Sequence, residues 1–214
     1  MGKDLNVVEN FGWNSPERGG HTMYTTPRIM ELLKQLRAHR VLDLGSGNGS
    51  LCNDLVNSGF EAVGVEYDAK GVEIARESYP GIRFYNKGVQ DDPQEVLAQE
   101  DGRKFDAVVC AEVVEHLFSP HLMPIFAREV LKSGGYLLVT TPYHGYLKNL
   151  ALSVANKWDF HHTALVHGGH VKFFSKSTLT QLLLENGFHV MSFYGTGRLP
   201  YLWKSMILLA NKVS

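Results

Sequence analysis

Residues 40 to 49, Arg-Val-Leu-Asp-Leu-Gly-Ser-Gly-Asn-Gly, join a short apolar run to a loop with glycine at three of its five positions. The apolar run predicts a buried strand, and the residues after the loop have the apolar spacing of a helix. A loop of this kind lets a ligand approach the backbone closely, because glycine has no side chain. Strand, glycine turn and helix in this order are typical of the sheet edge at which open α/β proteins bind ligands.

The spacing of the glycines separates the candidate cofactors. A dinucleotide loop, Gly-x-Gly-x-x-Gly, requires glycine at position 50, where this chain has Ser50. No Lys-Ser/Thr pair follows the loop, which excludes a nucleotide-triphosphate P-loop. A turn that only joins strand and helix remains an alternative. The loop residues that we expect to bind a cofactor are Asp43, Gly45, Ser46, Gly47, Asn48 and Gly49.

Strands and helices alternate along the rest of the chain. Strands are expected at residues 40–44, 61–65, 82–86, 105–110, 135–141, 188–194 and 203–210. Helices are expected at residues 26–38, 49–58, 69–78, 92–99, 119–132 and 175–186. The alternation predicts a parallel sheet with right-handed crossovers, and the short last connection predicts an antiparallel pair. We therefore predict a doubly wound α/β fold with seven mostly parallel strands and an antiparallel C-terminal hairpin.

Composition limits the class of protein. The chain has 214 residues, 44% of them hydrophobic, which predicts a single domain over residues 1–214. Residues 1–30 are interpreted as an N-terminal cap or arm, and residues 142–174 as an insertion on the substrate side. Lys and Arg number 21 against 22 Asp and Glu, so no overall positive charge favours nucleic acid. We expect a cytoplasmic protein without a transmembrane segment, and the sequence indicates no oligomeric state.

Glu66 ends the second predicted strand, about twenty residues after the loop, where a carboxylate can accept both hydroxyls of a ribose. The loop and Glu66-Tyr67-Asp68 resemble the first two motifs of class I S-adenosylmethionine-dependent methyltransferases, and the resemblance extends over residues 40 to 141. It implies that the loop contacts the methionine end of S-adenosylmethionine and that Glu66 holds the ribose. Tyr67, Val89 beside adenine, and Cys110 are further expected cofactor contacts.

Three polar residues, Glu112, Glu115 and His116, follow the fourth predicted strand. They share one face if this stretch is helical, because they stand at positions i, i+3 and i+4. Two neighbouring acids repel each other unless a cation or hydrogen bonds offset their charge. Glu and His suit Mg²⁺, Mn²⁺, Fe²⁺, Co²⁺ or Zn²⁺. The alternative is a metal-free site in which His116 is the general base.

The Glu-x-x-Glu-His element resembles that of the O-methyltransferases of ubiquinone biosynthesis and of the small-RNA 2′-O-methyltransferases. The second group adds a distant histidine, and His170 is the matching residue here. The resemblance implies a metal bound by Glu112, Glu115, His116 and His170, with Glu115 and His116 as catalytic residues.

The insertion at residues 142–174 is rich in aromatic and imidazole groups, which suit a planar or polyhydroxylated small molecule. Tyr143 and His144 are the expected substrate contacts, because they come directly after the fifth strand. Leu147 to Ala155 is interpreted as an apolar helix with a role in the core, in an oligomer contact or in substrate binding. A candidate cap over the cofactor contains Trp13, His21, Met23 and Tyr24.

These patterns predict an O-methyltransferase that uses S-adenosylmethionine and acts on a small hydroxylated metabolite, such as a phenolic, a quinone precursor or a sugar-like compound, with or without a divalent metal. Three alternatives stay open. They are a metal-independent N- or C-methyltransferase, an RNA 2′-O-methyltransferase, and a cofactor-binding protein without catalysis.

Overall fold

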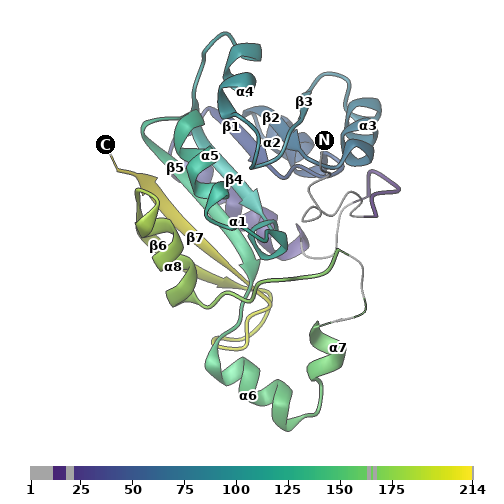
Figure 1. The fold of residues 1–214 in the computed structure, drawn as a ribbon, viewed down its shortest axis with the longest axis vertical. Coiled ribbons are helices and arrows are strands. Elements are labelled where there is room, and N and C mark those ends of the chain that lie inside the picture. Colours follow the sequence, from purple (N-terminus) through teal and green to yellow (C-terminus); the bar gives the residue numbers. More distant parts are fainter. Residues whose placement is uncertain (1–11, 18–21, 163–164, 166–167, 214) are drawn as a thin grey trace, which may run out of the picture.

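The computed structural model describes residues 12–17, 22–162, 165 and 168–213, and their centre is a seven-stranded sheet (Figure 1). The strands are β1 (Arg40–Leu44), β2 (Glu61–Glu66), β3 (Arg83–Asn86), β4 (Phe105–Ala111), β5 (Leu131–Pro142), β6 (Phe188–Thr196) and β7 (Ser205–Lys212). Their order is β3-β2-β1-β4-β5-β7-β6. Strands β1 to β5 are parallel, and β7 pairs antiparallel with both β5 and β6. The predicted fold class is confirmed.

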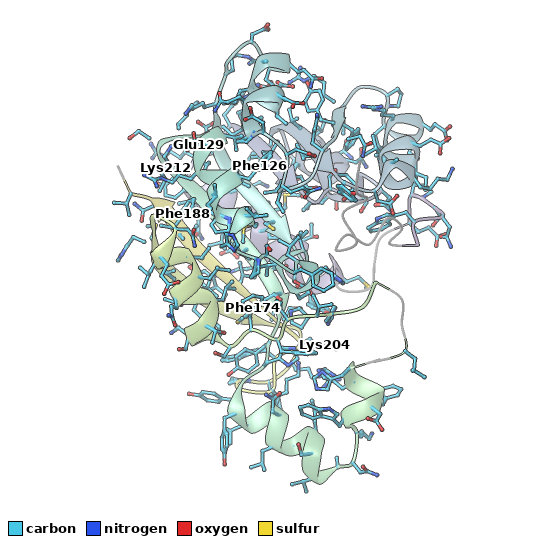
Figure 2. The ribbon with its side chains drawn as sticks, viewed as in Figure 1. Phe126, Glu129, Phe174, Phe188, Lys204 and Lys212 are labelled. Carbon is cyan, nitrogen blue, oxygen red and sulfur yellow. The ribbon has the colours of Figure 1, made fainter. Side chains whose placement is uncertain are left out.

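Helices cover both faces of this sheet. They are α1 (Thr22–Gln35), α2 (Ser50–Asn57), α3 (Ala69–Ser78), α4 (Pro93–Gln99), α5 (Leu122–Val130) and α8 (Lys176–Glu185). Two further helices, α6 (Tyr146–Val154) and α7 (Trp158–His162), belong to neither layer (Figure 1). Buried residues of α1, α2 and α3 form one core, and those of α4, α5 and α8 form the other. Phe126 and Phe188 belong to the second core (Figure 2). The three layers bury apolar side chains on both faces of the parallel strands, which explains why these strands are almost continuously apolar.

Local signals set several helix boundaries. The Ser175 hydroxyl accepts a hydrogen bond from Thr178 N, and the Thr178 hydroxyl accepts one from Ser175 N, which forms the capping box of α8. Asp68 caps α3 through Lys70 N. Helix α1 begins four residues before the predicted start and ends before Arg37, whose φ of 52° is left-handed.

The strand order places the ligand-binding edge. Connections run outward in opposite directions from β1 and β4, and open α/β sheets bind ligands in the crevice at such a switch point. The glycine loop follows β1, and residues 112–116 follow β4. Helices α6 and α7 lie beyond the end of β5, outside the two helical layers (Figure 1). No helix in the described part of the chain is long and apolar enough to cross a membrane.

Candidate functional site

A cavity of about 840 Å³ opens at the switch point. The predicted site residues that line it are Asp43, Gly45, Ser46, Gly47, Asn48, Glu66, Tyr67, Val89, Glu112, His116, His144 and His170. The volume lies within the ordinary range for small-molecule and cofactor sites. Elements that are far apart in the sequence therefore supply one common pocket.

The glycine loop crosses the end of the sheet in a conformation that suits glycine. Gly45 has φ 87°, and its N–H donates to Val65 O at 2.8 Å. A Cβ on Gly45 would collide with Val113 Cγ2, so the loop packs directly against the segment after β4. The backbone is left-handed and closely packed here, and both conditions exclude larger residues.

Glu66 fixes the loop to the end of β2. Its Oε2 accepts a hydrogen bond from Gly47 N at 2.8 Å, and its Oε1 accepts one from Asp68 N at 2.7 Å. Burial raises the pKa of Glu66, whereas these amides favour the ionised form. Each carboxylate oxygen has a second lone pair for a hydroxyl donor. The side chain is thus held rigidly and can still accept hydrogen bonds from a diol.

Two buried polar atoms in the cavity wall lack hydrogen-bond partners among the described residues. They are Asp43 Oδ1 and Ser46 Oγ. Burial raises the pKa of Asp43 to about 7, partly offset by a hydrogen bond that Cys52 Sγ donates at 3.5 Å. Buried polar groups are normally satisfied, so these atoms indicate a polar ligand. An ammonium group and a hydrogen-bond donor would satisfy them.

Residues 12–17 lie against the glycine loop. The Trp13 ring packs over Gly47, at the position that a Cβ would occupy. Asn48 Nδ2 donates to the carbonyls of Ser15 and Glu17, at 2.9 and 2.8 Å. Of the other residues in the predicted cap, Tyr24 lines the cavity, Met23 is exposed, and His21 lies outside the described residues.

The segment after β4 differs from the predicted helical turn. Glu112 has a left-handed φ of 56°, and only Val114–His116 forms a turn, of 3-10 type. Glu112 N donates to Thr140 O, which prolongs the pairing of β4 with β5. A shared helix face for Glu112, Glu115 and His116 required a helical stretch, and that condition is not met, because strand pairing holds Glu112 in place.

Glu115, His116 and His170 nevertheless converge. Each offers a ligand atom within 4.8 Å of those of the other two, and the two rings have centroids 4.9 Å apart. The amides of Val171 and Lys172 donate to Glu115 O at 2.9 and 3.0 Å, and this contact brings His170 to the turn. The cluster joins residues from two distant segments through backbone hydrogen bonds.

The donor atoms of this cluster are oriented by neighbours. Glu115 Oε2 accepts a hydrogen bond from Thr141 Oγ1 at 2.9 Å, whereas Oε1 is buried without a partner among the described residues. His116 Nδ1 donates to Gly168 O at 2.9 Å. Metal-ligating histidines usually donate their second nitrogen in this way. Glu, His and His with an unsatisfied oxygen are a donor set that fits a divalent cation.

Glu112 lies beside this cluster, not within it. Its Oε1 accepts a hydrogen bond from Thr140 Oγ1 at 2.8 Å. Burial raises the pKa of Glu112 to about 6, and burial together with the charge of Glu112 raises the pKa of Glu115 well above its usual value. The predicted set of four ligands thus becomes three converging residues and one adjacent buried acid.

Four other predicted residues do not line the cavity. Glu115 and Cys110 are buried behind its wall, and Cys110 belongs to the apolar core. Gly49 is the residue before α2. Tyr143 packs edge-on against Trp203, with centroids 5.2 Å apart. Tyr143 is held there because its N–H donates to Lys204 O, which directs the next residue, His144, toward the cavity.

The insertion and the turn between β6 and β7 place cations in the cavity that the sequence interpretation missed. Lys148, Arg198 and Lys204 line it near His144. Lys148 is the buried residue of α6, whereas apolar residues of that helix such as Val154 are 81% exposed. Of the alternatives for Leu147 to Ala155, the core role is therefore wrong, and the oligomer contact and substrate binding stay predictions. The one lysine within this largely apolar helix, Lys148, was the signal in the sequence that could have indicated a cavity-lining role for the helix.

Comparison with known proteins decides the family. A methyltransferase-domain model matches residues 21–192. The chain belongs to the methyltransferase-domain family. The ubiquinone biosynthesis O-methyltransferase of Bordetella avium is 32% identical over 117 residues, which cover 53% of this chain and 46% of that protein. The same-named protein of Ruegeria is 29% identical over 174 residues, which cover 77% and 66%. The first of these alignments thus spans about half the length of the curated relative.

Solved structures agree with the fold. Magnesium protoporphyrin IX methyltransferase of Synechocystis, with bound S-adenosylhomocysteine, has a TM-score of 0.63 at 21% identity, covering 90% of this chain and 83% of its own. A Bacillus halodurans methyltransferase structure has 0.65 at 16% identity, covering 86% and 99%. The [4+2]-cyclase SpnF reaches 0.64 at 15% identity, covering 87% and 81%. Family and fold identify a class I S-adenosylmethionine-dependent methyltransferase domain.

Proposed function

We propose that this domain transfers the methyl group of S-adenosylmethionine to a hydroxyl oxygen of a small molecule, with a divalent cation held by Glu115, His116 and His170. The observation that carries the proposal is the convergence of the glycine loop and the Glu-His-His cluster at one cavity. The relatives named ubiquinone biosynthesis O-methyltransferases support oxygen as the acceptor atom.

The residues at the loop fit S-adenosylmethionine. Asp43 and Ser46 offer unsatisfied oxygens to the polar methionine end, and Glu66 can accept hydrogen bonds from the ribose hydroxyls. Val89 and Tyr67 line the wall for adenine. The cofactor supplies an electrophilic methyl group, so the protein has to align an oxygen behind the carbon and remove its proton.

The cluster after β4 fits those two tasks. A divalent cation bound there would lower the pKa of an acceptor hydroxyl and fix its oxygen. Gly168 O orients His116, and Thr141 orients Glu115. Glu112, which lines the cavity beside Glu115, is a further carboxylate that can take the hydroxyl proton. The chemistry is thereby assigned to the crevice between β4, β5 and the segment that carries His170.

Metal content and turnover test this proposal together. The protein is stripped with a chelator, reloaded with Mg²⁺, Mn²⁺ or Zn²⁺, and assayed for methyl transfer to a panel of catechols and polyols. We expect turnover to fall by about 10²- to 10⁴-fold without metal, the usual range for lost proton-transfer assistance. His170→Ala should lower the bound metal measured by mass spectrometry. The exposed His189, on β6 and outside the cavity lining, provides the control variant His189→Ala.

Each part of the proposal can fail separately. Full turnover after complete metal removal would contradict the role of the metal. If His116→Ala also abolished turnover, His116 would be the general base of a metal-free reaction. Tight binding of S-adenosylhomocysteine without transfer to any acceptor in the panel would favour a cofactor-binding protein without catalysis.

A further inference from the structure

The end of the cavity formed by the insertion contains a second histidine cluster. His144, His161 and His162 offer ring nitrogens that all lie within 4.8 Å of one another. His144 and His162 are stacked with centroids 5.5 Å apart, and Phe173 packs edge-on against both rings. His162 Nε2 is buried without a hydrogen-bond partner among the described residues. The cluster thus presents at least one unsatisfied polar atom beside the cavity.

Two cationic side chains, Lys148 and Arg198, act on these rings. Lys148 is only 4% exposed, and its Nζ donates to the carbonyls of Tyr143 at 2.8 Å and Lys204 at 3.4 Å. The charge of Arg198 acts on both Lys148 and His161, whereas Lys204, which also lines the cavity, holds its Nζ 5.3 Å from the centroid of the Tyr24 ring. In the described part of the chain, none of these three cations forms an ion pair with a carboxylate. Of the three, only Lys148 is buried, and the charge of Glu112 offsets the Lys148 charge in part, because the pKa of Lys148 is still lowered. A buried cation that is incompletely balanced is costly, so an anionic ligand would be stabilising.

The pKa values of the basic groups in this cluster are lowered first by burial and second by neighbouring cations. Burial and then the charge of Lys148 lower the pKa of His144 to about 3 and that of His161 to about 4. Burial and then Arg198 lower the pKa of Lys148 itself to about 8. The imidazoles are therefore neutral donors in a positive field. Three histidines at this spacing also suit a metal, but the neighbouring Lys148 and Arg198 repel a cation.

We propose that this end of the cavity binds an anionic group of the acceptor, a carboxylate or a phosphate. Lys148 and Arg198 supply the charge, and His144, His161 and His162 supply hydrogen-bond donors. This inference rests on the proposed function, in which the hydroxyl of the acceptor faces the Glu-His-His cluster. It narrows the substrate class to small hydroxylated acids.

Tryptophan residues at different places report on the two ends of the cavity. Trp158 packs on His162 with centroids 4.1 Å apart, and Trp13 packs over the glycine loop. Inorganic phosphate is titrated into the ¹⁵N-labelled protein, with and without S-adenosylhomocysteine, and the indole N–H resonances are followed. We expect phosphate to shift the Trp158 resonance saturably and the cofactor product to shift that of Trp13.

Substitutions assign the phosphate site to the proposed residues. Lys148→Met should weaken phosphate binding at least tenfold and leave the affinity for S-adenosylhomocysteine unchanged. Because Lys148 is buried, Arg198→Gln on the exposed β6–β7 turn is the second variant, with the same direction of effect. Lys157→Met is the matched control, since Lys157 is an exposed lysine of the same insertion that does not line the cavity.

A pair of neutral and charged probes separates charge from shape. Benzoate should bind at least tenfold more tightly than benzamide, and Lys148→Met should abolish the difference. Absence of saturable phosphate and benzoate binding overturns the proposal, as does binding that neither variant weakens. If the protein bound zinc and His161→Ala abolished that binding, the histidine cluster would be a metal site and the anion proposal would be wrong. Phosphate binding is measured without turnover, so failure of methyl transfer would contradict the proposed function alone.

Discussion

The two ends of the cavity use opposite chemistry. At the cofactor end, backbone amides and the buried carboxylates Asp43 and Glu66 come from the ends of β1 and β2. At the insertion end, imidazoles and cations come from the connection between β5 and α6, from α6 and α7, and from the turn between β6 and β7. Figure 2 shows Lys204 at this second end, close to the insertion helices. The contrast assigns cofactor recognition to the sheet and acceptor recognition to the segments added to it.

The two ends also differ in how they are held. The cofactor end is continuous with one of the two apolar cores, through residues such as Leu44 and Val65. Helix α7 has no buried residue, and Lys148 is the buried residue of α6. Substitutions at the cofactor end should therefore change stability and binding together, whereas those on the outer face of the insertion should change little.

The largest effect is expected for Gly45→Ala. A left-handed alanine costs about 1–2 kcal/mol, and overpacking against Val113 adds roughly 1–3 kcal/mol. We expect the free energy of unfolding, measured in urea, to fall by the sum of these costs. Gly59→Ala is the matched control, because Gly59 has φ 91° and no atom lies within 4 Å of the position that its Cβ would occupy. Equal losses for the two variants would show that the loop is not packed against the segment after β4.

Glu66→Gln tests the cofactor end at constant size. The amide group would place an NH₂ against one of the two backbone N–H donors and remove the charge from both bonds. Hydrogen bonds to a charged group contribute about 1.5–3 kcal/mol, so the Kd for S-adenosylhomocysteine should rise about 10- to 100-fold. Glu73→Gln, at an exposed surface pair with Lys70, is the calorimetric control. An unchanged Kd in Glu66→Gln would remove the ribose assignment.

The smallest effect is expected on the outer face of the insertion. Val154 is 81% exposed, so Val154→Gln should change the free energy of unfolding by no more than about 0.5 kcal/mol. Leu55→Ala, in α2 directly after the glycine loop, should cost about 2–5 kcal/mol, because Leu55 is fully buried. A loss above about 1 kcal/mol in Val154→Gln would mean that α6 is packed more closely than its exposure indicates.

Local spacing explains what the sequence could predict. The glycine loop and Glu66 are recognisable because strand, turn and acid follow one another at fixed intervals. The helical interpretation of Glu112 is wrong because Thr140, on the neighbouring strand, binds its backbone N–H. Strand pairing of this kind is a tertiary effect that a five-residue pattern does not contain.

The residues at the insertion end were even harder to predict from the sequence, because distant segments supply them. Lys148 and Arg198 are fifty residues apart and lie on a helix and a turn that the sequence does not connect. The net charge of the chain is near zero and gives no sign of this positive region, because acidic residues, among them Asp43 and Glu66 at the other end of the cavity, offset its charge. Net charge describes the whole chain, whereas recognition depends on where the charges lie.

Titration of two variants with two ligands shows whether the two ends of the cavity bind different groups. Glu66→Gln and Lys148→Met are each titrated with S-adenosylhomocysteine and with phosphate, with Trp13 and Trp158 as the reporters. We predict that Glu66→Gln weakens binding of the cofactor product at least tenfold and leaves phosphate binding unchanged, and that Lys148→Met does the reverse. A variant that weakens both ligands equally, while remaining folded, would contradict the division of the cavity into an acidic cofactor end and a cationic acceptor end.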